Sequence, residues 1–293
     1  MNQATKITPS AQISSILLRG IPFHFDNPVV MAIVNINSDS FHGASRATSL
    51  DEILKLTEMH ISGGARFIDL GTTSTRPGAA LSHATEEIPV LLPAIRAIRK
   101  EFPGVFISVD TYHSTVAEVA VAEGADIIND ISGGRFDEFM FEKIAALRVP
   151  YILMHSVKTP ETMQDSPLYK DVLSEVLFDL ESKIQKLQHL GVSDIIIDPG
   201  FGFGKTNEHN FRLMAGLSNF KLANCPILVG ISRKSMITKT LGIKSDEALN
   251  GTTALNMYAL MNGAAILRVH DALEAFQTIQ LFQALNHTES SDI

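Results

Sequence analysis

Short apolar runs alternate with segments of helical period along most of the chain. Eight runs rich in Val, Ile and Leu have the continuous apolar character of strands that are buried on both faces. They cover residues 29–36, 65–71, 105–111, 125–132, 150–156, 193–200, 226–232 and 264–270. Helix-like segments lie between them, among them 49–63, 83–101, 113–123, 168–190 and 246–262, and another follows at 272–286. This alternation predicts a parallel sheet in which a helix follows each strand.

The number of strand–helix units decides between two architectures of the α/β class. Eight units with no break in composition favour a single-domain, closed (β/α)₈ TIM barrel, and an open doubly wound sheet is the alternative. We expect residues 29–287 to form this barrel. Residues 1–28 precede it, and the stretch 11–28 is a candidate for a small hairpin that closes the bottom of the barrel. Residues 288–293 form a polar tail.

Composition and charge exclude several classes of protein. The 293 residues are 45% hydrophobic, which is enough for a sizeable core, and the single Cys225 excludes a disulfide framework or a cysteine-based zinc cluster. A net charge of −8 without a basic block argues against a nucleic-acid partner. No apolar run approaches the roughly 18 residues of a membrane span. The polar start of the chain lacks the pattern of a secretory signal, so we expect a soluble, cytoplasmic protein with no membrane partner.

Nearly every apolar run ends in a polar residue. These residues are Asn35, Asp69, Asp110, Asn129, Asp130, His155, Asp198, Ser232, Arg268 and His270. A helix cap or a turn explains any one of them, but eight runs with the same ending favour a site, because the strand ends of a barrel converge on one mouth. Asp110, Asn129 and Asp198 are costly in such a position without a partner. A flat ring with several N–H donors would satisfy them.

Cationic residues also gather at the strand ends of this acidic chain. They are Arg76, Lys205, Arg233, Lys234, Arg268 and His270. Local positive charge of this kind suits an anionic substrate such as a phosphate ester, and the alternative is structural pairing with Asp69, Asp110 and Asp198. Lys234 is a candidate for a Schiff base as well, although its neighbour Arg233 favours a role in hydrogen bonding and charge. Loops rich in small and hydroxyl residues follow the first two strands and are candidate lids.

Seven segments together resemble those of the dihydropteroate synthase family, in that family's order. They are VNINSDSF (34–41), TSTRPGAA (73–80), SVDT (108–111), NDIS (129–132), DPGFGFGK (198–205), SRKSM (232–236) and RVHD (268–271). The resemblance implies the barrel that the period predicts. It also implies the condensation of 6-hydroxymethyl-7,8-dihydropterin diphosphate with 4-aminobenzoate to dihydropteroate and diphosphate, and a homodimer.

The resemblance also implies roles for individual residues. Those of the pterin slot would be Asp110, Asn129, Met154, Asp198, Lys234 and Arg268, with Arg268 stacking on the ring. Those of the diphosphate site would be Asn35, Thr75, Arg76, Arg268 and His270, with Asn35 beside a bound Mg²⁺. Those of the 4-aminobenzoate pocket would be Phe41, Thr75, Pro77, Phe203, Lys234 and Ser235. Asp110, Lys234, Arg268 and His270 would act in catalysis.

The two candidate lids depart from the family's pattern. Asn37 and Ser38 stand in place of Thr-Pro, His42 and Gly43 in place of Ser-Asp, and Thr73 in place of Glu. These changes spare the expected pterin and diphosphate contacts, so they leave open a non-catalytic pterin- or diphosphate-binding paralogue. A methyltetrahydrofolate-type methyltransferase barrel is a further alternative, but it has no use for the STRPG and SRKS segments or the Arg268–His270 pair.

Overall fold

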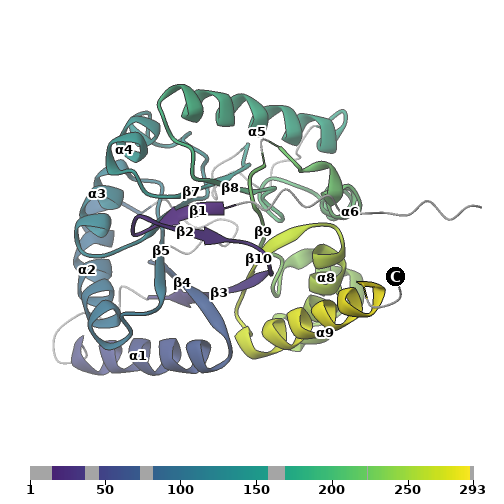
Figure 1. Cartoon of the computed structure of the whole chain (residues 1–293), viewed down its shortest axis with the longest axis horizontal. Helices are drawn as coiled ribbons and strands as arrows, with labels where there is room; N and C mark the ends of the chain where they lie inside the picture. Colours follow the sequence, from purple (N-terminus) through teal and green to yellow (C-terminus); the bar gives the residue numbers. More distant parts are fainter. Residues whose placement is uncertain (1–14, 37–45, 73–81, 158–168, 223, 291–293) are drawn as a thin grey trace, which may run out of the picture.

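Eight parallel strands close into a barrel in the computed structural model, which describes residues 15–36, 46–72, 82–157, 169–222 and 224–290. The order around the barrel is β10-β3-β4-β5-β6-β7-β8-β9 (Figure 1). The strands are β3 (Val29–Asn35), β4 (Ala65–Gly71), β5 (Phe106–Asp110), β6 (Ile127–Asp130), β7 (Tyr151–Met154), β8 (Ile195–Asp198), β9 (Ile227–Val229) and β10 (Ala264–Val269). All eight fall within the predicted runs, and closure confirms the barrel over the open sheet.

Helices surround the barrel (Figure 1). They are α1 (Arg46–Ser62), α2 (Ala84–Glu101), α3 (Ser114–Ala122), α4 (Met140–Leu147), α5 (Val172–His189), α6 (Asn207–Ala215), α7 (Ser235–Leu241), α8 (Leu249–Met261) and α9 (Ala272–Ser290). The last helix, α9, continues to Ser290, beyond residue 287, where the barrel domain is expected to end. Among the described residues no helix has the length and apolar character needed to cross a membrane.

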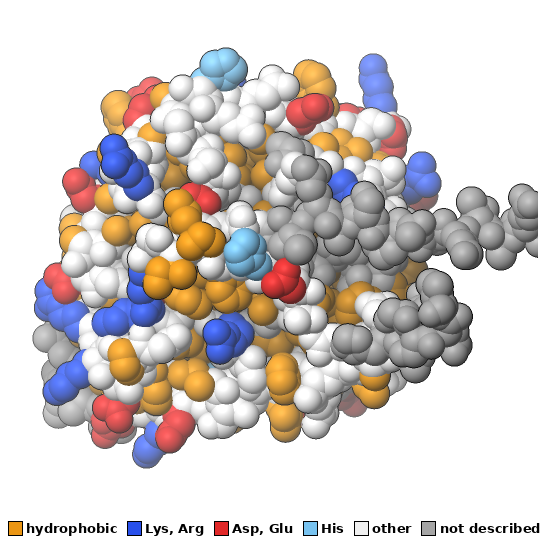
Figure 2. Space-filling model, in the orientation of Figure 1, with side chains coloured by type: hydrophobic (Ala, Val, Ile, Leu, Met, Phe, Trp, Pro, Cys, Tyr) orange, Lys and Arg blue, Asp and Glu red, His pale blue; other side chains and the backbone are white. Residues whose placement is uncertain are grey.

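A hairpin of β1 (Ser15–Leu18) and β2 (Ile21–His24) lies across one end of the barrel (Figure 1). Ile16 and Leu18 are 2% exposed and pack against inward side chains at the start of the barrel strands, including Phe67 and Ile127. The hairpin lies within residues 11–28 and covers the apolar end of the barrel. Figure 2 shows side chains of both charges interspersed over the described part of this face.

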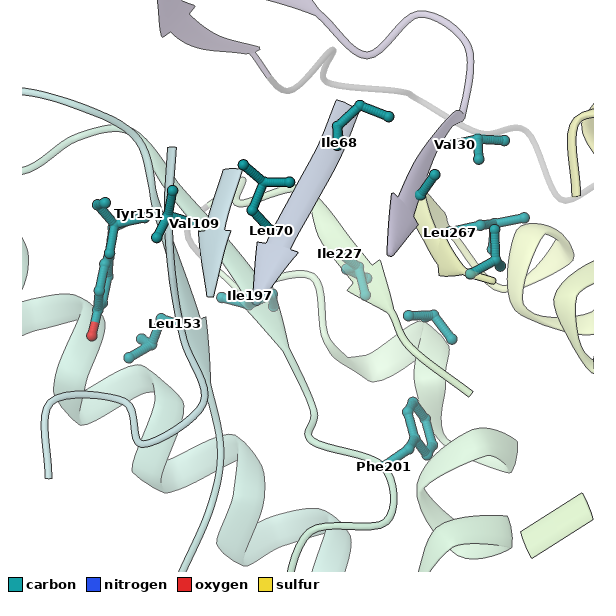
Figure 3. Close-up of a cluster of buried hydrophobic side chains, with 14 of the residues drawn as sticks. Val30, Ile68, Leu70, Val109, Tyr151, Leu153, Ile197, Phe201, Ile227 and Leu267 are labelled. Carbon is teal, nitrogen blue, oxygen red and sulfur yellow. The ribbon is translucent and has the colours of Figure 1, made fainter. Parts of the chain in front are cut away.

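Alternation along the strands sorts side chains into two layers. Outward residues such as Ile68 and Leu70 belong to the main core between strands and helices (Figure 3). Inward residues near the hairpin are apolar, as Phe67 is, whereas two positions further along β4 the inward residue is the fully buried Asp69. The barrel therefore has an apolar floor at the hairpin and polar residues toward its other end, called the mouth below, where the carboxyl ends of the strands meet.

A buried carboxylate, that of Asp126, helps to tie the hairpin to the barrel. Asp126 accepts hydrogen bonds from Arg19 Nε at 2.7 Å and from the backbone N–H of Ile107 at 2.8 Å, and it also pairs with Arg99. Replacing Asp126 with Ala removes an acceptor shared by two arginines and leaves the buried N–H of Ile107 without its partner. We expect the D126A change to lower the free energy of unfolding by about 2–3 kcal/mol in denaturant titrations.

The exposed ion pair of Arg96 and Glu123 provides the control for this measurement. Because solvent screens that pair, Arg96→Ala should leave the unfolding midpoint essentially unchanged. Equal effects of the two substitutions would contradict the structural role assigned to Asp126.

Candidate functional site

The register of the strands brings the predicted polar residues to one level of the barrel. Asn35 of β3 is paired with Gly71 of β4, Gly71 with Asp110 of β5, and Asp110 with Asn129 of β6. Further round the barrel, Met154 of β7 is paired with Asp198 of β8. These positions lie at or next to the carboxyl ends of their strands, so the side chains expected to bind one ligand share the mouth.

Asp69 lies inside the barrel just below the mouth and joins three other strands. Its Oδ2 accepts hydrogen bonds from Arg268 Nε at 2.6 Å and from Asn129 Nδ2 at 3.0 Å. Its Oδ1 accepts a hydrogen bond from Ser108 Oγ at 2.6 Å. Asp69 was not among the expected ligand-binding residues. The spacing in the sequence indicates its position: Asp69 lies two residues before Gly71 in the same strand, so the two residues lie on the same face of that strand.

Arg268 connects the two carboxylates of β4 and β5. Besides its bond to Asp69, its Nη2 donates to Asp110 Oδ2 at 2.8 Å. Although burial works in the opposite direction, Asp69 and Asp110 together raise the pKa of Arg268. Burial raises the pKa of Asp110, and Arg268 offsets part of this effect. Arg268 is thus both a member of structural ion pairs and a cation at the mouth, so the two interpretations of this residue are compatible.

Asp198 and Lys234 occupy the opposite part of the mouth. Asp198 Oδ1 accepts the backbone N–H of Gly200 at 2.7 Å, and burial raises the pKa of its carboxyl. Lys234 Nζ donates to the carbonyl oxygen of Phe201 at 2.5 Å and lies 4.8 Å from the centre of the Phe203 ring. Burial lowers the pKa of Lys234 to about 8. At neutral pH the ammonium is therefore largely retained, held over an aromatic face.

Apolar side chains form one wall beside these charges. Tyr112, Ile131, Met154 and Phe203 form a buried cluster, separate from the layer under the helices. A ring that packed against this cluster would have one apolar face, while its edge would meet the polar residues of the strand ends.

His270 lies beside Ser232 at the ends of β10 and β9. Ser232 Oγ accepts the backbone N–H of His270 at 3.3 Å and lies 3.0 Å from its Nδ1. Burial, followed by the charges of Arg268 and Arg233, lowers the pKa of His270 to about 4. His270 is therefore neutral at pH 7, and the expectation of a histidine cation at this point is wrong for the ligand-free protein.

Two inward glycines keep the mouth open. A Cβ on Gly71 would lie 3.5 Å from Asp110 Cβ and 3.8 Å from Asn35 Oδ1. A Cβ on Gly230 would lie 3.8 Å from Arg268 Cβ and 4.0 Å from Asp198 Oδ2. Any larger side chain at either position would fill space between the charged groups, so these glycines leave room for a ligand.

Three of the strand-end residues have other partners. Arg233 pairs with Asp271 through Nε at 3.0 Å, which agrees with a structural pairing although not with the partners expected. Lys205 Nζ is buried and donates to three backbone carbonyls, of which that of Gly200 is nearest at 2.8 Å. Asp130 accepts a hydrogen bond from Tyr151 Oη at 2.7 Å, in the layer outside the barrel. We therefore exclude these three from the mouth.

Several expected residues lie outside the part of the chain that the structure describes. These are Phe41, Thr75, Arg76 and Pro77, together with the lid positions that depart from the family's pattern. Of the remaining expected residues, Ser235 is the exposed first residue of α7 and directly follows Lys234. Asn35 is exposed at the end of β3.

A divalent cation would find few protein ligands at the mouth. Among the described residues no group of three or more His, Cys, Asp or Glu side chains is placed to hold a metal ion. Asn35 Oδ1 is the amide oxygen nearest to the space beside Gly71. One oxygen ligand of this kind fits Mg²⁺, which keeps most of its water and usually binds through substrate phosphates.

A separate cavity of about 370 Å³ lies outside the barrel mouth, between the end of β7 and α5. His155, Tyr169, Phe178 and Asp179 contribute to its lining. It contains none of the residues expected to bind substrate, so the mouth and not this cavity is the candidate site.

A family model described as pterin binding enzyme matches residues 31–270, which include all eight barrel strands except the first two residues of β3. The barrel and its mouth are therefore those of a pterin-binding enzyme. The dihydropteroate synthase of Escherichia coli (strain K12) is 39% identical over 268 residues, which are 91% of this chain and 94% of that protein. This chain belongs to the dihydropteroate synthase family.

Solved structures agree with this assignment. The dihydropteroate synthase of Yersinia pestis in a sulfonamide drug complex superposes with a TM-score of 0.87 at 34% identity, covering 93% of this chain and 99% of that one. The Xanthomonas albilineans enzyme with 4-aminobenzoic acid gives a TM-score of 0.85 at 33% identity, covering 94% of this chain and 99% of that one.

Proposed function

We propose that this protein is a dihydropteroate synthase, which condenses 6-hydroxymethyl-7,8-dihydropterin diphosphate with 4-aminobenzoate and releases diphosphate in folate biosynthesis. The observation that carries the proposal is the convergence of Asp110, Asn129 and Asp198 with Arg268 and Lys234 at one barrel mouth. Hydrogen-bond acceptors beside cations suit a substrate with a donor-rich ring and an anionic tail. The assignment of the relatives as dihydropteroate synthases supports the same reaction.

The pterin ring would lie across the mouth with its donor edge toward three acceptors. Asp110, Asn129 and Asp198 would receive its N–H groups, and Met154 would pack against the ring. Arg268, fixed by two carboxylates, would stack on the ring and present its remaining N–H groups. The carboxylates also place negative charge beside a ring that becomes electron-poor during the reaction.

The diphosphate would extend toward Asn35, Arg268 and His270, and the expected contacts of Thr75 and Arg76 fall outside the described residues. Bound Mg²⁺, with Asn35 as its protein ligand, would neutralise the charge of the leaving diphosphate. Arg268 would hold phosphate oxygens through its planar fork, and His270 would offer a ring N–H.

The 4-aminobenzoate would lie beside Phe203, Lys234 and Ser235, with Phe41, Thr75 and Pro77 as expected neighbours outside the described residues. Lys234 and the N–H of Ser235 would hold its carboxylate, and the Phe203 ring would pack against the arene. This arrangement would aim the weakly basic amine at the exocyclic methylene of the pterin.

We propose a dissociative substitution. The C–O bond to diphosphate breaks first, the dihydropterin carries the positive charge on its methylene, and the arylamine nitrogen then forms the new C–N bond and loses a proton. No protein nucleophile is required. A covalent pterin adduct on Lys234 after rapid quench would contradict this mechanism.

His270 provides a pH-dependent test of the diphosphate contact. Its pKa is lowered to about 4 in the free protein, so at pH 5.5 the ring is neutral. A diphosphate beside it favours the charged form, and binding should therefore take up as much as about one proton per site. Calorimetric titrations at pH 5.5 in two buffers of different ionisation enthalpy measure this uptake. We expect His270→Gln to reduce it, and equal uptake by the two proteins would place the diphosphate elsewhere.

A product assay tests the function itself. The purified protein is incubated with the pterin diphosphate, Mg²⁺ and 4-aminobenzoate, and dihydropteroate and diphosphate are measured together. We expect equal amounts of both. Tight binding of the pterin with neither product would favour the non-catalytic paralogue, whereas methyl transfer from methyltetrahydrofolate to a corrinoid would favour the methyltransferase.

We further propose that the protein forms a homodimer through α8 and α9, which lie side by side in Figure 1. Large apolar side chains on these helices are exposed, among them Met261 at 69%, Leu273 at 50% and Leu281 at 63%. Exposed apolar groups at this density are typical of an interface. Sedimentation at micromolar concentration should show a dimer that Met261→Asp weakens, and a monomeric unaltered protein would contradict the proposal.

We also propose a cytoplasmic location, which the lone cysteine favours because it offers no disulfide framework. Fractionation of the source cells tests this point, and recovery of the protein outside the cytoplasm would contradict it.

A further inference from the structure

The carboxylate of Asp69 determines which way the Asn129 amide points. Asn129 Nδ2 lies 3.0 Å from Asp69 Oδ2, and the same oxygen accepts a bond from the Arg268 guanidinium at 2.6 Å. A carboxylate beside an arginine only accepts hydrogen bonds, so the amide nitrogen and not the amide oxygen must face it. The amide oxygen of Asn129 is therefore turned away from Asp69.

This orientation makes Asn129 an acceptor toward the mouth. Its strand neighbour Asp110 is an acceptor as well, and so is Asp198 across the barrel. A flipped amide would instead present an N–H donor there, and that donor would oppose the N–H groups of a pterin edge. Asp69 itself is fully buried, with hydrogen bonds to both of its oxygens, and it lies below the level of these three residues.

The same carboxylate fixes the plane of Arg268. The Nε bond to Asp69 and the Nη2 bond to Asp110 hold the guanidinium at two points, from two strands. A planar group held in this way loses little further freedom when a ligand stacks on it. Asp69 thus holds two of the groups that would meet the ring, Asn129 and Arg268.

We propose that Asp69 is a positioning residue that determines the specificity of the slot for a ring edge rich in N–H donors. It acts through Asn129 and Arg268 and does not touch the substrate. The proposal deepens the proposed function and rests on it. Its chemical consequence is discrimination between 6-hydroxymethylpterin, whose 2-amino group donates, and 6-hydroxymethyllumazine, which has a carbonyl oxygen at that position.

Calorimetric affinities for these two probes test the proposal. The unaltered protein should prefer the pterin by at least about 100-fold, because the lumazine oxygen would face acceptors. Asp69→Asn retains the size of the side chain but releases the orientation of Asn129, and it should reduce this preference by about tenfold or more. A preference within about twofold of the unaltered value would overturn the proposal.

Asp126→Asn is the matched control. Asp126 is also a buried, arginine-paired carboxylate, but it lies at the hairpin end of the barrel. This substitution should lower stability and leave the preference for the pterin unchanged. If the unaltered protein binds neither probe, or binds them equally, the proposed function fails. If it discriminates and Asp69→Asn discriminates equally well, only the role of Asp69 fails.

A measurement on the unaltered protein decides the matter if Asp69→Asn does not fold. The side-chain amide of Asn129, identified in nitrogen-15 spectra by its loss in Asn129→Ser, should have one N–H protected from solvent exchange. Exchange of both hydrogens at the solvent rate would show that Nδ2 does not bond to Asp69, which would overturn the proposal.

Discussion

Arg268→Met is expected to reduce both stability and activity more than any other single substitution at the mouth. It removes the guanidinium that lies 2.6 Å from Asp69 and 2.8 Å from Asp110, and it leaves two buried carboxylates without their cation. The expected loss is about 3–5 kcal/mol in the free energy of unfolding. kcat/KM for the pterin diphosphate should fall at least about 100-fold, because the charge that holds the leaving group is lost. Denaturant titrations and steady-state kinetics on the folded fraction measure the two effects separately.

Arg233→Met is the matched control for this substitution. Arg233 also follows a barrel strand, but its side chain is 34% exposed and pairs with Asp271 outside the mouth. Solvent screening makes such a pair worth little, so stability should change by less than about 1 kcal/mol. kcat/KM should stay within about threefold of the unaltered value. A change of that size corresponds to less free energy than one hydrogen bond to a charged group contributes. Similar kinetic losses in the two variants would contradict the assignment of Arg268.

Asp198→Asn is expected to separate binding from stability. The Asn side chain retains an oxygen for the N–H of Gly200, but its amide replaces the carboxylate that would receive the pterin donors. A hydrogen bond to a charged acceptor contributes about 1.5–3 kcal/mol, so kcat/KM for the pterin diphosphate should fall about 10- to 100-fold. The KM for 4-aminobenzoate should change much less, because that substrate would lie beside Lys234 and Phe203.

The effect of Asp198→Asn on stability should depend on pH. Burial raises the pKa of Asp198, so the folded chain holds this proton more tightly than the unfolded chain does. The carboxyl group therefore favours folding below its ordinary pKa, and this contribution is lost as the pH rises through the raised pKa. The neutral amide of the variant does not undergo this change, so the stability of Asp198→Asn relative to the unaltered protein should increase as the pH rises.

Asp130→Asn serves as the comparison, because burial raises the pKa of this carboxyl as well. Asp130 faces the outer layer, and its two oxygens accept the N–H groups of Ser132 and Gly134 and the hydroxyl of Tyr151. An amide nitrogen cannot accept these bonds, so Asp130→Asn should be less stable and should retain its KM for the pterin. A loss of pterin affinity in Asp130→Asn alone would reverse the assignment of the two carboxylates.

The amino-acid sequence predicts the barrel because the patterns that produce it are local and repeat along the chain. Each strand is a continuous apolar run, and the hairpin and the longer helices carry their own period, so no distant contact is needed to recognise them. The short helices α4, α6 and α7 have about two turns each, which establish a period only weakly. The strand ends also identify Asp110, Asn129, Asp198 and Arg268 as neighbours, because parallel strands end at the same mouth.

Which partner each charged residue selects could not be predicted in the same way. Asn129 and Asp130 are adjacent in the chain, yet one faces the mouth and the other the outer layer, and the exact register decides between them. The pairing of Arg233 with Asp271 likewise depends on where the two strand ends lie in the fold and not on their spacing along the chain. The role of Asp69 depends on contacts across the inside of the barrel to β6 and β10, which no spacing along the chain specifies.

A crystal structure of the protein grown with the pterin diphosphate and Mg²⁺ would show whether the barrel mouth binds this substrate. We expect the ring between Met154 and Arg268, with its N–H groups on Asp110, Asn129 and Asp198 and its diphosphate beside His270. A ring bound outside the barrel, for example in the cavity beside His155, with the three mouth acceptors left unpaired, would contradict this expectation.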